Sequence, residues 1–127
     1  MLLSFVADGA ADTPALIFRQ VSAPAVQELR NAIEPLMAGI ARQVPLHEVK
    51  AIAVDGGVRL SANAGTAVGA RQSGPGAFIW EETKPGWFAI FEALEPLATA
   101  ESGTTVRFKH LGTRGPVTVI VTTGDRW

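Results

Sequence analysis

Two stretches of the chain carry apolar residues at spacings of three and four, which is the pattern of a helix that buries one face. The first stretch follows Ser22, a common N-cap residue, and has Pro24 in its first turn. Pro35 removes one intrahelical donor and predicts a kink or a break, and Pro45 ends the segment. The apolar stripe of this first helix consists of Val26, Leu29, Ile33, Leu36, Met37, Ile40 and Val44.

The second helical stretch has the same layout. It follows Thr83, again a capping residue type, and has Pro85 in its first turn. Pro96 interrupts it late, and Gly103 is expected to stop it. The apolar stripe of this second helix consists of Trp87, Ile90, Phe91, Leu94, Leu97 and Ala98.

The segments around the two helices have the composition of β-strands. Asp55-Gly56-Gly57 predicts a hairpin, because glycine adopts the positive φ angles that tight turns require, and Gly115-Pro116 predicts a second one. Residues 63–76 read as a connection that contains a short edge strand. The expected strands cover residues 2–7, 16–21, 48–54, 58–62, 66–71, 77–82, 104–111 and 117–122.

The two helical stretches match each other when the chain is shifted against itself by 61 positions. Ser22 then meets Thr83, Pro24 meets Pro85, and residues 32–36 meet residues 93–97 without a gap. The same shift places Ile17-Phe18 on Phe78-Ile79 in the preceding strands. The match predicts a duplicated strand-helix-strand-strand unit, with pseudo-repeats of approximately 15–71 and 76–127. The alternative is a chance similarity of two amphipathic helices.

These elements predict one α+β domain over residues 1–127, with an antiparallel-rich sheet and both helices on one face. A single unit of this size buries too little surface to be comfortably stable alone. The two units are therefore expected either to share one sheet or to pair two sheets across a common core.

Composition mainly excludes functions. Eleven Lys and Arg stand against 12 Asp and Glu, a formal net charge of −1, which argues against nucleic acid as a partner. The absence of cysteine excludes disulfides, a thiolate nucleophile and cysteine-bound metals, and neither histidine has a second ligand at metal-binding spacing. We therefore expect no metal and no cofactor. Since no apolar stretch approaches membrane-spanning length, we expect no membrane association. The absence of disulfides fits a cytoplasmic location.

The adjacent residues Glu81 and Glu82 end a predicted strand, so alternation sends their side chains to opposite faces. Glu82 shares its face with Trp80 and is expected to meet the apolar side. Burial favours the neutral form of a carboxyl group, which suits a general acid or a site for a cationic ligand. A glutamate that turns to solvent or caps the next helix is the alternative. Trp80 and Trp87 are candidates for pocket walls or for core.

The last quarter of the chain holds the other candidate residues. His110 is expected on the packed face of its strand together with Val106 and Phe108, as a core or rim histidine or as a catalytic base. Arg107, Lys109 and Arg114 make this region basic and are candidates for a protein interaction surface or for protection of a sheet edge.

Function is predicted mainly by elimination, since the chain has neither a Gly-x-Ser-x-Gly nucleophile motif nor a Walker-type phosphate loop. The first hypothesis is a non-catalytic interaction protein, such as an inhibitor-, immunity- or accessory-type bacterial protein, with a protein partner or as a homodimer. The second is a small-molecule-binding domain with a cleft between the repeats, using Trp80, Trp87 and Glu81 or Glu82. The third is a small enzyme that uses His110 and a carboxylate.

Overall fold

The structure is a computed structural model that describes residues 1–10, 12–99, 108–112 and 114–124. The fold is α+β, as predicted, with two helices and strands in two mixed sheets. The elements in chain order are β1 (Leu2–Ala10), β2 (Thr13–Arg19), α1 (Ala23–Ala38), β3 (Gln43–Pro45), the 3-10 turn η1 (Leu46–Glu48), β4 (Ala53–Val54), β5 (Arg59–Ala64), β6 (Gly69–Gly74), β7 (Ala77–Glu82), α2 (Lys84–Ala98), β8 (Phe108–Gly112) and β9 (Thr118–Thr122).

Each sheet combines strands from both halves of the chain. The first has the order β4-β1-β2-β9-β8 and the second the order β3-β5-β7-β6. In the first sheet the antiparallel pair β1–β2 lies beside the antiparallel pair β9–β8 through a parallel β2–β9 contact. In the second sheet the antiparallel pair β6–β7 meets the antiparallel pair β5–β3 through a parallel β7–β5 contact. The two sheets thus repeat one pairing pattern.

This pattern changes the predicted unit. In this pattern β1, β2, α1, β3 and β5 correspond to β6, β7, α2, β8 and β9, so each half contains a strand-strand-helix-strand-strand unit. The first half has the two-residue strand β4 in addition. The sequence comparison missed the first strand of each half. Duplication as the origin of the two halves stays a prediction.

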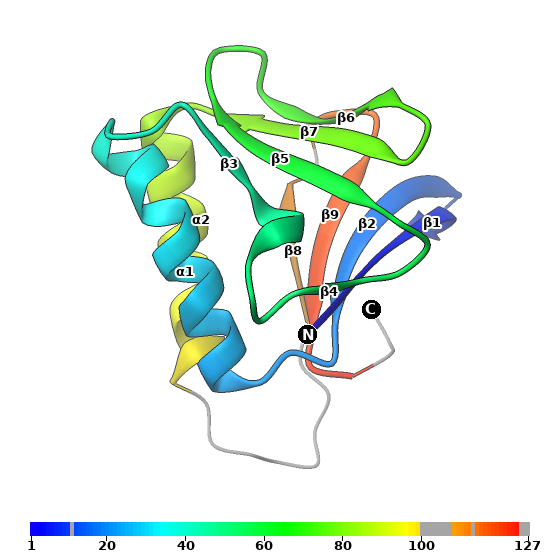
Figure 1. The fold of residues 1–127 in the computed structure, drawn as a ribbon, viewed down its shortest axis with the longest axis horizontal. Helices are drawn as coiled ribbons and strands as arrows, with labels where there is room; N and C mark the ends of the chain where they lie inside the picture. The colour runs from blue at the N-terminus through cyan, green and yellow to red at the C-terminus, as the bar shows by residue number, and fades with distance from the viewer. Residues whose placement is uncertain (11, 100–107, 113, 125–127) are drawn as a thin grey trace.

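The two helices lie side by side and antiparallel on one side of the molecule, with the sheets on the other (Figure 1). At their crossing Arg30 Nε donates to the Phe91 carbonyl oxygen at 3.1 Å, and the guanidinium lies 3.9 Å above the Phe91 ring. Arg30 and Phe91 are 61 positions apart, as are the matched helix residues. Contact between equivalent positions is what a pseudo-twofold axis between the helices produces.

The helix starts are as predicted, but the helix ends are not. Ser22 Oγ accepts a hydrogen bond from the Ala25 amide, and Thr83 Oγ1 accepts one from the Gly86 amide. Helix α1 continues past Pro35 and ends at Ala38, because Gly39 adopts a left-handed φ of 75°. The predicted stripe was therefore too long, since Ile40 is 83% exposed and Val44 lies on β3. Helix α2 ends at Ala98, and Gly103 lies outside the described residues.

One of the two predicted hairpins is wrong. Gly56 and Gly57 do adopt left-handed φ angles of 66° and 71° in a tight turn. The strands on either side of this turn belong to different sheets, since β4 pairs with β1 and β5 pairs with β7 and β3. The predicted strand over 48–54 is reduced to β4, after η1 and a turn. The second hairpin, β8–β9, is confirmed.

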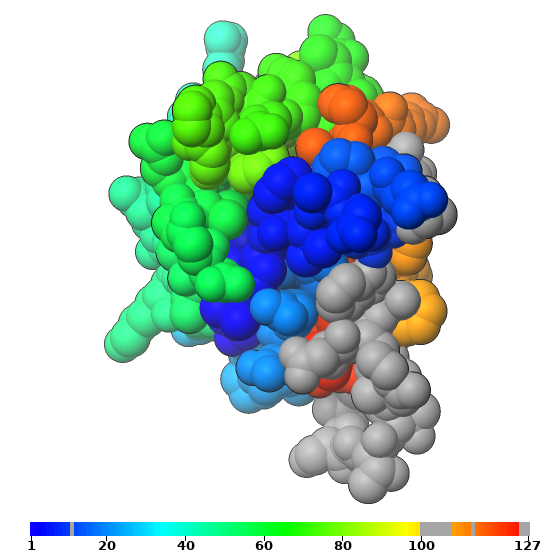
Figure 2. Space-filling view, turned by 90° about the vertical axis from the view of Figure 1, so that its right-hand side faces the viewer, coloured from blue at the N-terminus to red at the C-terminus, as the bar shows by residue number. Residues whose placement is uncertain are grey.

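A single large core fills the space between the helices and the two sheets. The sheets meet along the face shown in Figure 2, where β1 and β2 (blue) lie beside the second sheet (green), and the Phe5 and Phe78 rings are 4.7 Å apart. The shift of 61 positions fails in the strands, because it matches the core residue Phe18 with Ile79 on the outer face. Gln20, with a φ of 54°, lies in the three-residue link before α1, whereas β7 leads directly into the cap of α2.

Candidate functional site

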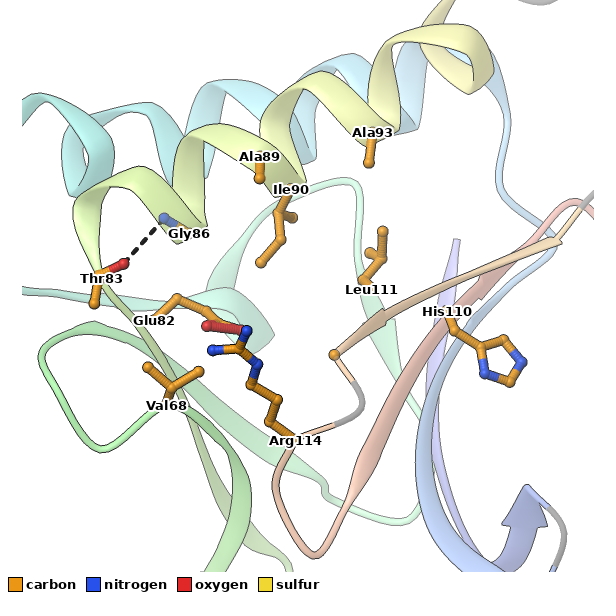
Figure 3. A pocket seen from close by; sticks show the side chains of 11 residues that line it. Val68, Glu82, Thr83, Gly86, Ala89, Ile90, Ala93, His110, Leu111 and Arg114 are labelled. Atoms are coloured by element: carbon orange, nitrogen blue, oxygen red, sulfur yellow. Dashed lines mark hydrogen bonds between the residues drawn. The ribbon is translucent and has the colours of Figure 1, made fainter.

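A pocket of about 310 Å³ opens between α2, the end of β7, β8 and the turn before β9 (Figure 3). Its aliphatic walls come from three separate segments, namely the turn before β6, helix α2 and strand β8. Its two charged groups, Glu82 and Arg114, come from the end of β7 and from the turn before β9. The lining consists of Val68, Glu82, Thr83, Gly86, Ala89, Ile90, Ala93, His110, Leu111, Gly112 and Arg114.

Small residues on one face of α2 leave the space. Gly86, Ala89 and Ala93 follow one another at intervals of three and four, so they lie along the same side of the helix. Across the pocket, Gly112 lies against Trp80. A Cβ atom added at Gly112 would be only 3.1 Å from the indole nitrogen. Larger side chains at these positions would fill the pocket.

Glu82 is the polar centre of the pocket. It is the last residue of β7 and faces inward with Phe78 and Trp80, which confirms the predicted alternation. Its side chain is buried at 8% exposure, and this burial raises the pKa of the carboxyl group. The positive charge of Arg114 and the indole N–H of Trp80 lower the pKa by less than burial raises it. The net environment disfavours the free carboxylate.

Trp80 lies behind Glu82 and is 1% exposed. Its ring packs edge to face against Trp87, with 4.8 Å between the ring centroids. Although the Trp80 N–H is close enough to lower the Glu82 pKa, it has no partner at hydrogen-bond geometry in the described part of the chain. Trp87 differs, since its Nε1 donates to the Asn63 carbonyl oxygen at 2.9 Å. Neither tryptophan is part of the pocket lining, so both belong to the core behind it.

Arg114 approaches the pocket from the opposite side. It is exposed on the turn before β9, and its guanidinium points toward Glu82 (Figure 3). Within the described ranges the two side chains do not form an ion pair, which would require a nitrogen–oxygen distance of 4.0 Å or less. The turn itself is held in place, because the Val117 amide donates to the Ala70 carbonyl at 3.1 Å and Gly115 packs directly on Ala70.

His110 does not face the packed side, so that prediction is wrong. It pairs with Ile120 of β9, whose side chain lies on the sheet face opposite the main core. Its ring is exposed, lies 6.2 Å from the Phe108 ring and points away from Glu82 (Figure 3). A bulge after His110 lets Leu111 point into the pocket instead.

Glu81 lies on the other face of β7 and has a different role. It accepts a hydrogen bond from the Ala67 amide at 2.7 Å and pairs with Arg71 at 3.2 Å. The amide hydrogen bond, followed by the Arg71 interaction, lowers the pKa of Glu81. Glu81 therefore fastens the turn between β5 and β6, and the structure does not bring it together with Glu82.

The basic residues predicted as an interaction surface are only partly described. Lys109 is exposed on the edge strand β8, Arg114 lies at the pocket, and Arg107 is outside the described residues. The aliphatic lining was not predicted from sequence. Val68, Ile90 and Leu111 carry no chemical signal of their own, and only the tertiary arrangement brings them together.

Other kinds of site find no support in the described ranges. They contain no group of three or more His, Cys, Asp or Glu side chains placed to hold a metal ion. None of their helices is long and apolar enough to cross a membrane. Comparisons of the chain with protein-family models, with curated proteins and with solved structures find no match.

Proposed function

We propose that the protein is a non-catalytic small-molecule-binding domain whose ligand occupies the pocket between α2 and β8. The observation that supports it is the buried Glu82 carboxyl group at the wall of an open, otherwise largely aliphatic pocket. An ionised group that is buried without a close partner is costly. A ligand that brings an N–H donor or a cationic nitrogen to Glu82 would offset that cost, while its apolar part lies against the aliphatic walls.

The size of the pocket limits the ligand. A volume of about 310 Å³ is at the lower end of the range of roughly 300–1,000 Å³ that is usual for small-molecule sites. The ligand is therefore a metabolite-sized molecule with a short apolar part. A nucleotide or a long acyl chain would extend beyond the pocket.

Support for binding rather than catalysis comes from the groups around Glu82. The Thr83 hydroxyl oxygen already accepts the Gly86 amide, and the His110 ring points away from Glu82. The remaining charged groups of the lining are a carboxylate and a guanidinium, which can hold and orient a ligand.

The proposal is tested by titrating ¹⁵N-labelled protein with isopentylamine and, separately, with isopentanol, the alcohol of the same shape. The amine is expected to shift the Trp80 indole N–H and the Leu111 and Gly112 amides, with the alcohol acting more weakly. Glu82→Gln should abolish the difference, whereas Glu92→Gln, on an exposed part of α2, should preserve it. Equal shifts from both probes, or no shifts at the pocket, would contradict the proposal.

A second candidate function is association with a second copy of the chain through β8. This short edge strand carries Phe108, which is 54% exposed, next to the exposed Lys109. An unpaired strand edge with an exposed aromatic residue is suited to strand pairing between chains. Sedimentation equilibrium should then show a dimer that Phe108→Ser weakens. A monomer at all concentrations would exclude this candidate.

A further inference from the structure

Two opposite charges of the pocket lining, Glu82 and Arg114, face each other without forming an ion pair. Glu82 is held at the end of β7, and Arg114 extends from a turn that is fastened to β6 by the Val117–Ala70 hydrogen bond. Their side chains point toward one another, yet they do not reach ion-pair distance (Figure 3). Behind Glu82, the buried Trp80 N–H lies beside Gly112 and close to the Glu82 carboxyl group, outside the pocket lining.

We propose that the ligand is a zwitterion of the α-amino acid type, whose ammonium group binds Glu82 and whose carboxylate binds Arg114. This inference rests on the proposed function and specifies its ligand class. An α-amino acid has both charged groups attached to one carbon atom, so it suits a site whose own two charges face each other without pairing.

Electrostatics disfavours molecules that carry only one of the two charges. A simple amine that reaches Glu82 comes close to the like charge of Arg114, and a simple acid that reaches Arg114 comes close to Glu82. A zwitterion meets an opposite charge at each end. Arginine also suits the carboxylate end, because its planar guanidinium can donate two parallel hydrogen bonds to one carboxylate.

The walls indicate the side chain of the amino acid. Ile90 and Leu111 point into the pocket from α2 and β8, and Ala93 leaves room beside them (Figure 3). These groups offer aliphatic contact without a further charged or hydroxyl partner, so a short branched or unbranched apolar side chain is favoured.

Three probes that share one carbon skeleton separate the contributions. Leucine has both charges, isopentylamine lacks the carboxylate, and isocaproate lacks the ammonium group. Titrations monitored by NMR at the Trp80 indole N–H should rank leucine about tenfold or more ahead of the other two, since each charge-assisted contact strengthens binding. Arg114→Gln should lower leucine affinity to that of isopentylamine and should not weaken the amine. Glu82→Gln should lower leucine affinity to that of isocaproate.

Controls keep the outcome interpretable. Arg114 is exposed and forms no ion pair with the described residues, so its variant should fold with an unchanged melting temperature. Lys109→Gln, at an exposed position of β8 outside the pocket lining, should leave all three affinities unchanged. Arg114→Lys keeps the charge without the planar fork and should retain part of the leucine preference.

The possible failures differ from each other. If isopentylamine binds in a Glu82-dependent way and leucine binds no better, the zwitterion inference is overturned and the proposed pocket function stands. If Arg114→Gln strengthens amine and leucine binding alike, Arg114 competes with the ligand and the inference is again overturned. If none of the three probes shifts the pocket resonances, the proposed function falls together with the inference.

Discussion

The residue directly before each helix cap differs between the two halves of the molecule. It is Val21 before α1 and Glu82 before α2, and the two side chains are buried almost equally, at 7% and 8% exposure. Both helices then start with the same side-chain-to-amide hydrogen bond and a proline in the first turn. Since this position accepts valine in one half, the fold does not require a glutamate in the other. A buried carboxyl group that packing does not require is typical of a functional site.

The largest change in stability is expected when Val21 of the first half is replaced by glutamate, the residue at the matching position of the second half. Val21→Glu places a carboxyl group in the main core, where the native residue is apolar. An unpaired buried charge costs about 3 kcal/mol or more, so the free energy of unfolding should fall by that amount at pH 7. Urea denaturation measures it. A loss as small as that of an exposed substitution would show that Val21 and Glu82 are not in comparable environments.

The reverse exchange should stabilise the protein. Glu82→Val removes the buried carboxyl group and is expected to raise the free energy of unfolding by about 1 kcal/mol at pH 7, while it abolishes amine binding. Burial raises the Glu82 pKa in the folded state, so the folded protein holds this proton more tightly than the unfolded chain. The destabilisation is therefore complete above the raised pKa and disappears as the pH falls below the ordinary value of 4.5.

Melting temperatures of wild type and Glu82→Val, measured from below pH 4.5 to pH 7, test whether the destabilisation by Glu82 grows as the pH rises. The two curves should converge at acid pH and separate as the pH rises toward 7. Curves that separate at acid pH instead would mean that the folded state favours the ionised form of Glu82, against the effect of burial.

The helices and their caps were predictable from sequence, because Ser22, Thr83 and the apolar spacing are local signals. The burial of Glu82 was also predictable, because it follows from the alternation of side chains along a single strand. The assignment of strands to sheets was not, since Asp55-Gly56-Gly57 forms the same tight turn whether the flanking strands pair with each other or with β1 and β7. His110 was misplaced for the same reason: its face depends on the pairing with Ile120. The Glu82–Arg114 pair joins residues 32 positions apart, and nothing in the local sequence of either one indicates it.

The neighbouring glutamates provide a smaller test. Glu81 is stabilised as the carboxylate by the Ala67 amide and by Arg71, and its pKa is lowered. Glu81→Gln should cost about 1 kcal/mol, because an amide oxygen accepts more weakly and the ion pair with the half-exposed Arg71 contributes little. The stabilisation by Glu81 is present above the ordinary pKa of 4.5 and is lost as the pH falls through the lowered value, opposite in sign to the effect of Glu82. Urea denaturation at several pH values separates the two, and leucine binding should be unaffected.

The smallest expected effect concerns the feature that the two halves share. Ser22→Ala and Thr83→Ala each remove a single cap hydrogen bond, of 3.3 Å in α1 and 3.1 Å in α2, and each should cost about 0.5–1 kcal/mol. The two variants should lower the melting temperature equally if the two helices contribute alike to one cooperative core. If Thr83→Ala costs clearly more, the difference arises at the pocket, because Thr83 lines it beside Glu82 and its loss would release the helix turn that carries Gly86. The added leucine probe distinguishes these cases, since only a loosened pocket would also lose affinity for it.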